Sequence, residues 1–361
     1  MTIDKQNVIS ILNDISSNDL SGFILNESIK KIDVNGVNIE LDILVTNPTL
    51  QFKEKIRLEI QRIISKVYPK AQISINFIFE KSNENNSVSS IKNIIAIASG
   101  KGGVGKSTIS SNLAIALQKK GLKVGLIDAD IYGPSIPLMF DAQDSRPKQQ
   151  KIKDATLMLP IESYGVKIMS IGFFSNPDEA IVWRGPMATK ALKTIINETY
   201  WGELDYLLID LPPGTSDIHL SLVQTVSITG ALIVTTPQPV ALVDASKAIS
   251  MFNSKNINVP ILGIVENMSW HIVDEQKYYL FGRDGGKTLS ASKGIPLLAE
   301  IPLNQSIRVA GDVGRPAALQ DSSLSSLFTN LSNKVVESTN NRNKDLPTTK
   351  KVEITHSRGC N

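Results

Sequence analysis

The chain has 361 residues, of which 42% are hydrophobic, 38 are basic and 35 are acidic. This length favours two domains, and a formal net charge of +3 excludes a strong general attraction to nucleic acid or membranes. The first residues show no signal-peptide pattern, and no apolar run approaches the ~20 residues that span a bilayer. A single cysteine, Cys360, excludes an intrachain disulfide and a cysteine-rich zinc site. We expect a cytoplasmic protein with no nucleic-acid or membrane partner.

Residues 1–80 predict a small accessory domain of the α+β type. Segments 32–34 and 37–43 alternate between apolar and polar residues around Asn35-Gly36, which is the strongest short signal for a hairpin. A weak apolar repeat precedes them, and a longer helical repeat and another alternating segment follow. The expected order is therefore α-β-β-α-β. Residues 81–87 are polar and lack an apolar period, so we expect a linker over residues 81–90.

Residues 91–336 predict the main domain. Five short, continuously apolar segments alternate with helical patterns, at 94–98, 124–128, 206–210, 231–235 and 260–265. Such strands are typical of an α/β fold in which a mostly parallel sheet carries helices on both faces. Ligands of these folds bind at the carboxyl ends of the strands. Residues 337–361 are polar and aperiodic, and we expect a disordered tail.

The most informative segment is a glycine-rich loop between the first main strand and the helical pattern that follows. It contains ten residues that predict a phosphate-binding loop: Ser99, Gly100, Lys101, Gly102, Gly103, Val104, Gly105, Lys106, Ser107 and Thr108. Glycines let successive N–H groups turn toward one anion, and the helix N-terminus adds partial positive charge. In this pattern Lys106 reaches the β- and γ-phosphates and the Ser107 hydroxyl binds Mg²⁺. We therefore expect an ATP and Mg²⁺ site in a P-loop NTPase.

Three aspartates follow the ends of neighbouring apolar strands. An aspartate beside a phosphate loop is placed to hold Mg²⁺ through water, and Asp210 suits this role best. Asp130 lies two residues beyond its strand and is expected to orient the attacking water. Asp128 contacts either Mg²⁺ or the loop, and for it a helix-capping role stays open.

Lys101 is not required by a minimal phosphate loop. It is either a solvated charge or a cation for the transition state, in which negative charge spreads over the phosphoryl oxygens. The segment from Gly100 to Thr108 resembles the deviant phosphate loop of the MinD, ParA and nitrogenase-iron-protein class. That resemblance implies that Lys101 reaches the nucleotide of a second subunit and that two nucleotides lie inside a homodimer. Lys101, Lys106 and Asp130 are then the catalytic residues.

Further strings resemble the Mrp/ApbC branch of this class, in family order: 128–137, 183–187, 205–215, 235–238 and 266–269. The branch consists of cytosolic ATPases that carry an iron–sulfur cluster between subunits and pass it to apo-proteins, and the N-terminal unit resembles an accessory domain of iron–sulfur assembly proteins. The resemblance implies that Asn267 contacts adenine and that Pro237 and Gln238 form a switch. Asp217 and His219 belong to that switch or only cap and hydrogen-bond locally. Segments 132–134 and 183–187 are expected at the dimer face.

The chain departs from this branch where iron ligands are expected. The family carries a Cys-x-x-Cys pair shortly after Glu-Asn-Met-Ser, and the corresponding residues 270–279 contain no cysteine. A cysteine common in the accessory domain is replaced by Leu50. Two copies of Cys360 provide two of the four thiolates that a [4Fe–4S] cluster needs. His271 and Asp274 can ligate iron or serve as plain surface groups.

The preferred interpretation is an ATP-hydrolysing homodimer that assists assembly or transfer of iron–sulfur clusters, with scaffold or apo-protein clients as partners. One alternative is a positioning ATPase, although residues 349–356 lack the broad apolar face of a membrane-binding helix. Another is a nucleotide-dependent scaffold without turnover, which has no need of Lys101 or Asp130.

Overall fold

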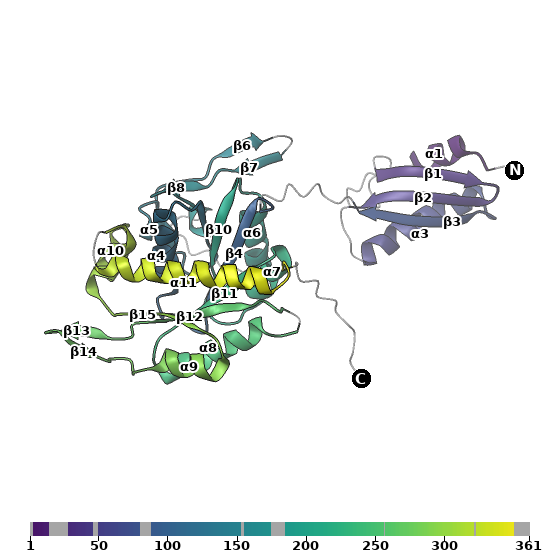
Figure 1. Ribbon diagram of the computed structural model, residues 1–361. Helices are drawn as coiled ribbons and strands as arrows, with labels where there is room; N and C mark the ends of the chain where they lie inside the picture. The colour runs from purple at the N-terminus through teal and green to yellow at the C-terminus, as the bar shows by residue number, and fades with distance from the viewer. Residues whose placement is uncertain are drawn as a thin grey trace. The chain divides into compact units, whose positions relative to one another are not determined.

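The structure is a computed structural model that describes residues 3–13, 28–45, 50–79, 88–152, 155–174, 185–255, 257–320 and 323–349. The chain divides into two compact units, Met1–Asn85 and Asn86–Asn361 (Figure 1). Each unit has its own hydrophobic core. The two units are therefore considered separately.

The first unit has the expected order of elements: α1 (Lys5–Asn13), β1 (Ile29–Asn35), β2 (Asn38–Val45), α3 (Leu50–Val67) and β3 (Gln72–Phe79). β1 pairs with β2 in the antiparallel direction through a tight turn, where Gly36 has a φ of 65°. β3 pairs with β2 in the parallel direction. The apolar faces of α1 and α3 pack on the sheet, with Leu12, Leu41 and Ile60 fully buried. The small α+β unit is confirmed.

The second unit contains an eight-stranded sheet. Its spatial order is β15 (Leu297–Ile301), β12 (Ile261–Asn267), β11 (Gly230–Thr235), β4 (Ile91–Ser99), β10 (Leu204–Asp210), β5 (Val124–Asp128), β9 (Val166–Ser170) and β8 (Ile161–Ser163). All neighbours are parallel except β8, which runs antiparallel to β9 at the edge. The mostly parallel α/β sheet is therefore confirmed, with edge strands that the apolar runs did not predict.

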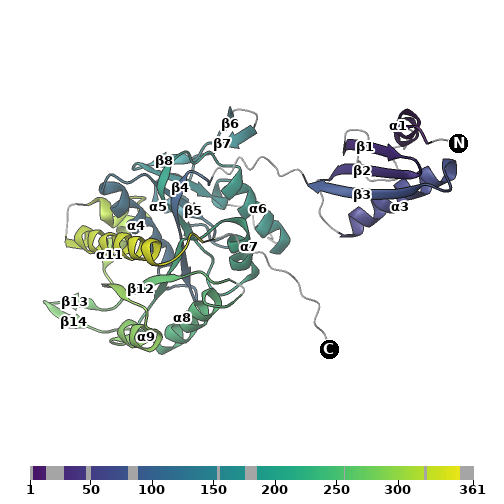
Figure 2. The same cartoon turned by 45° about the vertical axis from the view of Figure 1, so that its right-hand side comes forward.

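Helices cover both faces of this sheet (Figures 1 and 2). One face packs against α4 (Lys106–Lys119), α5 (Ile136–Met139), α10 (Gln305–Asp312) and α11 (Ser323–Asp345). The other packs against α6 (Gly185–Asn197), α7 (Asp217–Thr225), α8 (Pro239–Phe252) and α9 (Gly285–Lys293). Side chains of β4 alternate between the two cores, with Ile95 and Ile97 on the α4 side. This double burial explains why the central strands are continuously apolar.

Short elements complete the unit: η1 (Ile171–Phe174), η2 (Ala317–Leu319), the hairpin β6–β7 (Gln149–Ile152 and Ala155–Met158) and the hairpin β13–β14 (His271–Val273 and Gln276–Tyr278). The prediction of a disordered tail from residue 337 is wrong for residues 337–345. These residues continue α11, in which Thr339 is fully buried and donates its hydroxyl to the Val335 carbonyl at 2.7 Å. Within the described residues, no helix has the length and apolar character needed to cross a bilayer.

Candidate nucleotide site

The phosphate loop connects β4 to α4 at the carboxyl edge of the sheet. Gly103 and Gly105 have φ angles of 81° and 82°, a backbone region that favours glycine. A Cβ atom on Gly105 would also collide with the Asn267 amide, which donates from Nδ2 to the Val104 carbonyl at 2.9 Å. The loop shape therefore depends on glycine and on one buried side chain from β12.

The loop is also fixed from behind by two other elements. A Cβ atom on Gly100 would collide with the backbone of Asp244 in α8, so the loop and the helix are in direct contact. The Gly214 amide donates to the Ser99 carbonyl at 2.9 Å, which connects the loop to the segment after β10. These contacts leave the inner side of the loop open as a cavity of about 230 Å³.

Lys106 and Asp210 form a buried ion pair at the base of this cavity. The Lys106 Nζ atom lies 2.9 Å from Asp210 Oδ2, and the two side chains are 6% and 0% exposed. The ammonium makes no aligned hydrogen bond within the described residues, although it contacts the carboxylate. Its N–H groups are therefore available to an anion in the loop.

Two serines of α4 fix the Asp210 carboxylate. Ser107 Oγ donates to Asp210 Oδ2 and Ser110 Oγ donates to Asp210 Oδ1, each at 2.6 Å. Ser107 belongs to the loop motif, whereas Ser110 lies one turn further and is fully buried. The sequence analysis missed Ser110, because no phosphate-loop pattern specifies that position. The spacing Ser107-x-x-Ser110 on one helix face was the available signal.

Asp128 lies beside Asp210 across the β5–β10 pairing, and its side chain is fully buried. Its carboxylate accepts hydrogen bonds from the amides of Asp130 and Ile136 and from Ser170 Oγ, at 3.1–3.2 Å. Burial, and then the neighbouring charge of Asp210, raise the Asp128 pKa to about 7. None of these three hydrogen bonds comes from the phosphate loop, and the donor Ile136 is the first residue of α5, so the contacts match the helix-capping alternative. The magnesium role of Asp128 stays a prediction.

Asp130 and Lys101 line the same cavity as the phosphate loop. Asp130 is half-buried and its Oδ1 atom accepts a hydrogen bond from the Tyr132 amide at 3.3 Å. Burial raises the Asp130 pKa, while the positive charge of Lys106 opposes that rise. The carboxylate can therefore accept a proton more readily than an exposed aspartate.

A second cavity of about 250 Å³ continues from the first, since Thr108 and Met139 line both. Asn267, Met268 and Leu303 form further parts of its wall, together with Ile307 and Arg308. The mix of an amide and apolar side chains suits a flat polar ring such as a nucleotide base. Asn267 therefore contacts the phosphate loop and also lines this adjoining cavity, and its contact with adenine stays a prediction.

The expected switch residues lie near the loop but do not line its cavity. Gln238 is the residue before α8, and its carbonyl accepts from the amides of Ala241 and Leu242. His219 is 1% exposed, its Nδ1 atom lies 3.2 Å from the Ser216 carbonyl, and its Nε2 atom has no hydrogen-bond partner among the described residues. Burial lowers the His219 pKa to about 4, so the ring is neutral at pH 7.

The segment where the family carries two thiols forms the exposed hairpin β13–β14. Asp274 and Glu275 occupy its turn with φ angles of 47° and 64°. His271 Nδ1 lies 2.9 Å from the Leu303 carbonyl, and the Lys277 ammonium lies 3.9 Å from the Trp270 ring centroid. The described residues contain no cluster of three or more histidine, cysteine or acidic side chains placed to hold a metal. Trp183, Arg184 and Cys360 lie outside the described residues.

Comparisons with known proteins agree with this arrangement. Residues 90–336 match the ParA family described as NUBPL iron-transfer P-loop NTPases. A protein of Haemophilus influenzae is 48% identical over 260 residues, which cover 71% of this chain and 69% of that protein. One from Escherichia coli K12 is 44% identical over 290 residues, which cover 79% and 77%. Both relatives are named iron–sulfur cluster carrier protein.

Solved structures give the same fold. A nucleotide-binding protein of Archaeoglobus fulgidus in complex with ADP is 35% identical and covers 65% of this chain and 93% of its own, with a TM-score of 0.56. The cell division ATPase MinD of Pyrococcus furiosus is 26% identical and covers 68% and 99%, with a TM-score of 0.52. These relatives share the large domain, whose carboxyl edge carries the site described above.

Proposed function

The chain belongs to the ParA family of NUBPL iron-transfer P-loop NTPases, and on that basis we propose that it is an ATP-hydrolysing homodimer that assists the assembly or transfer of iron–sulfur clusters. The observation that carries this proposal is the joint placement of Lys101, Lys106, Ser107 and Asp130 around one cavity, with Asp210 paired to Lys106 beneath it. A scaffold that only senses nucleotide does not need Lys101 or Asp130 at this cavity.

Triphosphate binding follows from the loop. Amides of residues 100–108 surround the β-phosphate, and the buried Lys106 ammonium contacts the β- and γ-phosphate oxygens. The base occupies the adjoining cavity against Asn267. Since Asn267 also holds the Val104 carbonyl, base binding and loop shape depend on the same amide.

The donor set fits a magnesium ion that accompanies the nucleotide. The Ser107 hydroxyl and the Asp210 carboxylate are hard oxygen donors of the kind that magnesium prefers, and they lie beside the loop that binds the phosphates. When bound there, magnesium neutralises charge on the β- and γ-phosphate oxygens. Asp210 is already oriented for this role by its two serine hydrogen bonds.

Hydrolysis requires a positioned water and a cation at the γ-phosphate. Asp130 orients the water and accepts its proton, which its raised pKa favours. Lys101 of the partner subunit reaches the γ-phosphate and stabilises the charge that spreads over its oxygens. The exposed Tyr132, Val240 and Val243, in segments that follow β5 and β11, are available to the dimer face.

The iron–sulfur cluster is the cargo of this ATPase. The relatives are named for carrying such a cluster, whereas this chain lacks the Cys-x-x-Cys pair in the segment 270–279. We propose that nucleotide turnover drives a change at the dimer face that receives or releases a cluster or a client. Thiolates from a client or a small thiol complete the ligands that the chain itself lacks.

Activation of an apo-[4Fe–4S] enzyme tests this function. The full chain is incubated anaerobically with iron, sulfide, Mg·ATP and the apo-enzyme, and the recovered enzyme activity is measured against time. We expect ATP to accelerate activation with the wild type but not with Lys101→Ala. Equal activation with and without ATP would contradict the function, and iron counting on the reisolated chain shows whether the cargo stays bound.

A further inference from the structure

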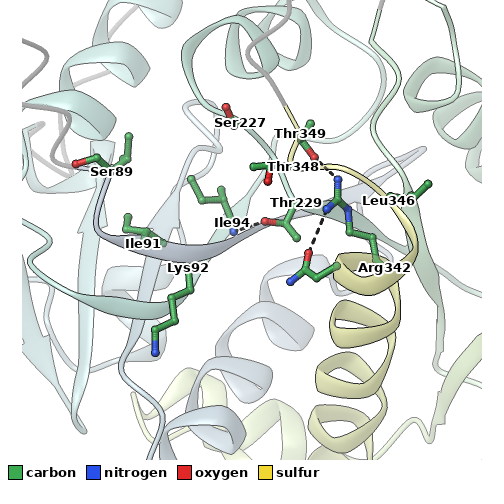
Figure 3. A pocket seen from close by; sticks show the side chains of 12 residues that line it. Ser89, Ile91, Lys92, Ile94, Ser227, Thr229, Arg342, Leu346, Thr348 and Thr349 are labelled. Carbon is green, nitrogen blue, oxygen red and sulfur yellow. Dashed lines mark hydrogen bonds between the residues drawn. The ribbon is translucent and has the colours of Figure 1, made fainter.

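A third cavity, of about 370 Å³, lies at the opposite edge of the large sheet from the phosphate loop. Its walls come from the amino end of β4, the turn before β11, and the end of α11 with the segment that follows it (Figure 3). Since β4 spans nine residues at roughly 3.3 Å each, nucleotide cannot reach this cavity from the loop. Its volume is within the range of small-molecule sites.

The cavity contains one cation without a counter-ion. The described residues that line it include Lys92 and Arg342 but no aspartate or glutamate. Lys92 is paired with Asp205 at 2.8 Å, whereas none of the ion pairs found among the described residues involves Arg342. No acidic side chain among the described residues of this wall therefore compensates the positive charge of Arg342.

Neutral oxygens hold the Arg342 guanidinium in place. Nη2 donates to the Pro347 carbonyl at 2.8 Å and to Thr349 Oγ1 at 2.6 Å, and Nη1 donates to Asn343 Oδ1 at 3.1 Å. Nε is buried without a hydrogen-bond partner in the described part of the chain, so two of the five N–H donors make no bond to any residue there. Burial lowers the Arg342 pKa, which reflects the cost of holding this charge without an anion.

Apart from Lys92 and Asn343, the other residues that line the cavity are hydroxyl-bearing or apolar. Figure 3 shows the Arg342 side chain extending from the end of α11 toward Thr349 and Thr229. Ser227 and Thr348 add further hydroxyl groups, and the apolar side chains of the lining are Val88, Ile91, Ile94 and Leu346. A single cation next to apolar walls matches a ligand with one negative charge on an apolar body.

We propose that this cavity is a binding site for a small organic monocarboxylate, whose carboxylate pairs with Arg342 and whose apolar part packs on Ile91 and Leu346. The alternative is that Arg342 serves only to fasten residues 347–349 behind α11. A fastening role does not depend on any added anion, so the two roles can be distinguished.

Isothermal titration with benzoate tests the proposal, with benzamide as the neutral molecule of the same shape. The full chain is first saturated with Mg·ADP, so that the phosphate loop is occupied, and chloride is matched throughout. We expect saturable benzoate binding below about 10 mM, no binding of benzamide, and at least about tenfold weaker benzoate binding in Arg342→Gln. Arg146→Gln, which removes one exposed charge outside the cavity lining, should bind benzoate like the wild type.

Arg342→Gln can lose the fastening contacts, so a second variant keeps the test decisive. Ser227→Met places a larger side chain in the cavity wall and leaves Arg342 and its three hydrogen bonds unchanged. Loss of benzoate binding in this folded variant would support the site. The absence of saturable binding to the wild type, or equal binding by wild type, Arg342→Gln and Ser227→Met, would overturn it.

Discussion

The phosphate loop and the hairpin β13–β14 both follow strands of the same sheet, yet they differ in burial and in the side chains that they carry. The loop has glycines in left-handed backbone, a buried ion pair and carboxylates held by serine and amide donors. The hairpin has two acidic residues in left-handed backbone and exposes Ile272, Val273 and Tyr278. The loop carries the residues predicted for nucleotide binding, whereas the hairpin contains no cysteine. The proposed function therefore assigns ATP turnover and cluster binding to separate groups of residues.

Among substitutions in the phosphate loop, Lys101→Ala should have the largest effect on ATP turnover. Turnover should fall about 10³-fold because the transition state loses its cation, while ATP binding should persist. Steady-state phosphate release and titration with a non-hydrolysable analogue measure the two quantities. Lys247→Ala removes an exposed lysine of α8 and should change neither. Unchanged turnover in Lys101→Ala would exclude the proposed role.

Lys106→Ala should instead remove binding. The loop loses its buried ammonium, so nucleotide affinity should fall at least about 100-fold in a titration. Asp210 also loses its ion-pair partner, so circular dichroism must first show that the variant is folded. Near-normal affinity in the folded variant would place the phosphates elsewhere.

His219→Leu tests how firmly the segment after Asp210 is packed. The His219 pKa is lowered from 6.5 to about 4, so below pH 6.5 the unfolded chain takes up a proton that the folded chain does not. This group therefore lowers the stability of the wild type as pH falls from 6.5 to 4. Urea unfolding at pH 7 and pH 5 should show a loss about 2 kcal/mol larger in the wild type than in His219→Leu.

The Asp128 pKa is raised to about 7, so this group increases the stability of the folded state as pH falls. The contribution is present in both proteins and cancels in the difference between them. Identical pH dependence in the two proteins would show that His219 ionises freely in the folded state.

Ser110→Ala should weaken magnesium binding during turnover without abolishing nucleotide binding. Asp210 then keeps only its Ser107 hydrogen bond and the Lys106 ion pair, and its carboxylate is less well oriented. The Mg²⁺ concentration for half-maximal turnover should rise about tenfold. Ser111→Ala is the matched control, because Ser111 is equally buried but contacts Met139. An equal effect of both substitutions would indicate loss of packing alone.

Placing two cysteines in the hairpin should have the smallest effect on turnover. It also tests most clearly whether the hairpin and the phosphate loop act independently. Val273 and Gln276 pair across the turn with Cys-x-x-Cys spacing. The variant V273C/Q276C should retain iron after anaerobic reconstitution at a higher ratio than the wild type. Its ATP turnover should stay within about twofold, since no residue of the hairpin lines the loop cavity. A large loss of turnover would show that the two segments are coupled.

Sequence patterns predicted the sheet, its helices and the position of the phosphate loop because these depend on local periodicity and on glycine at defined positions. The role of Ser110 was missed because its partner is 100 residues away. The extension of α11 to Asp345 was also missed. Its polar sequence gives little apolar period, and the buried Thr339 is satisfied by its own helix. The hairpin could not be predicted, since Asp274-Glu275 is an unusual pair for left-handed backbone.

Subunit mixing tests the proposed mechanism most directly. Lys101→Ala binds nucleotide but lacks the cation, and Lys106→Ala supplies Lys101 but binds no nucleotide, so each is inactive alone. If Lys101 acts across the dimer, each mixed dimer contains one competent site, and an equal mixture should recover roughly a quarter of wild-type turnover. A mixture that stays as inactive as its two components, in spite of proven subunit exchange, would contradict the account.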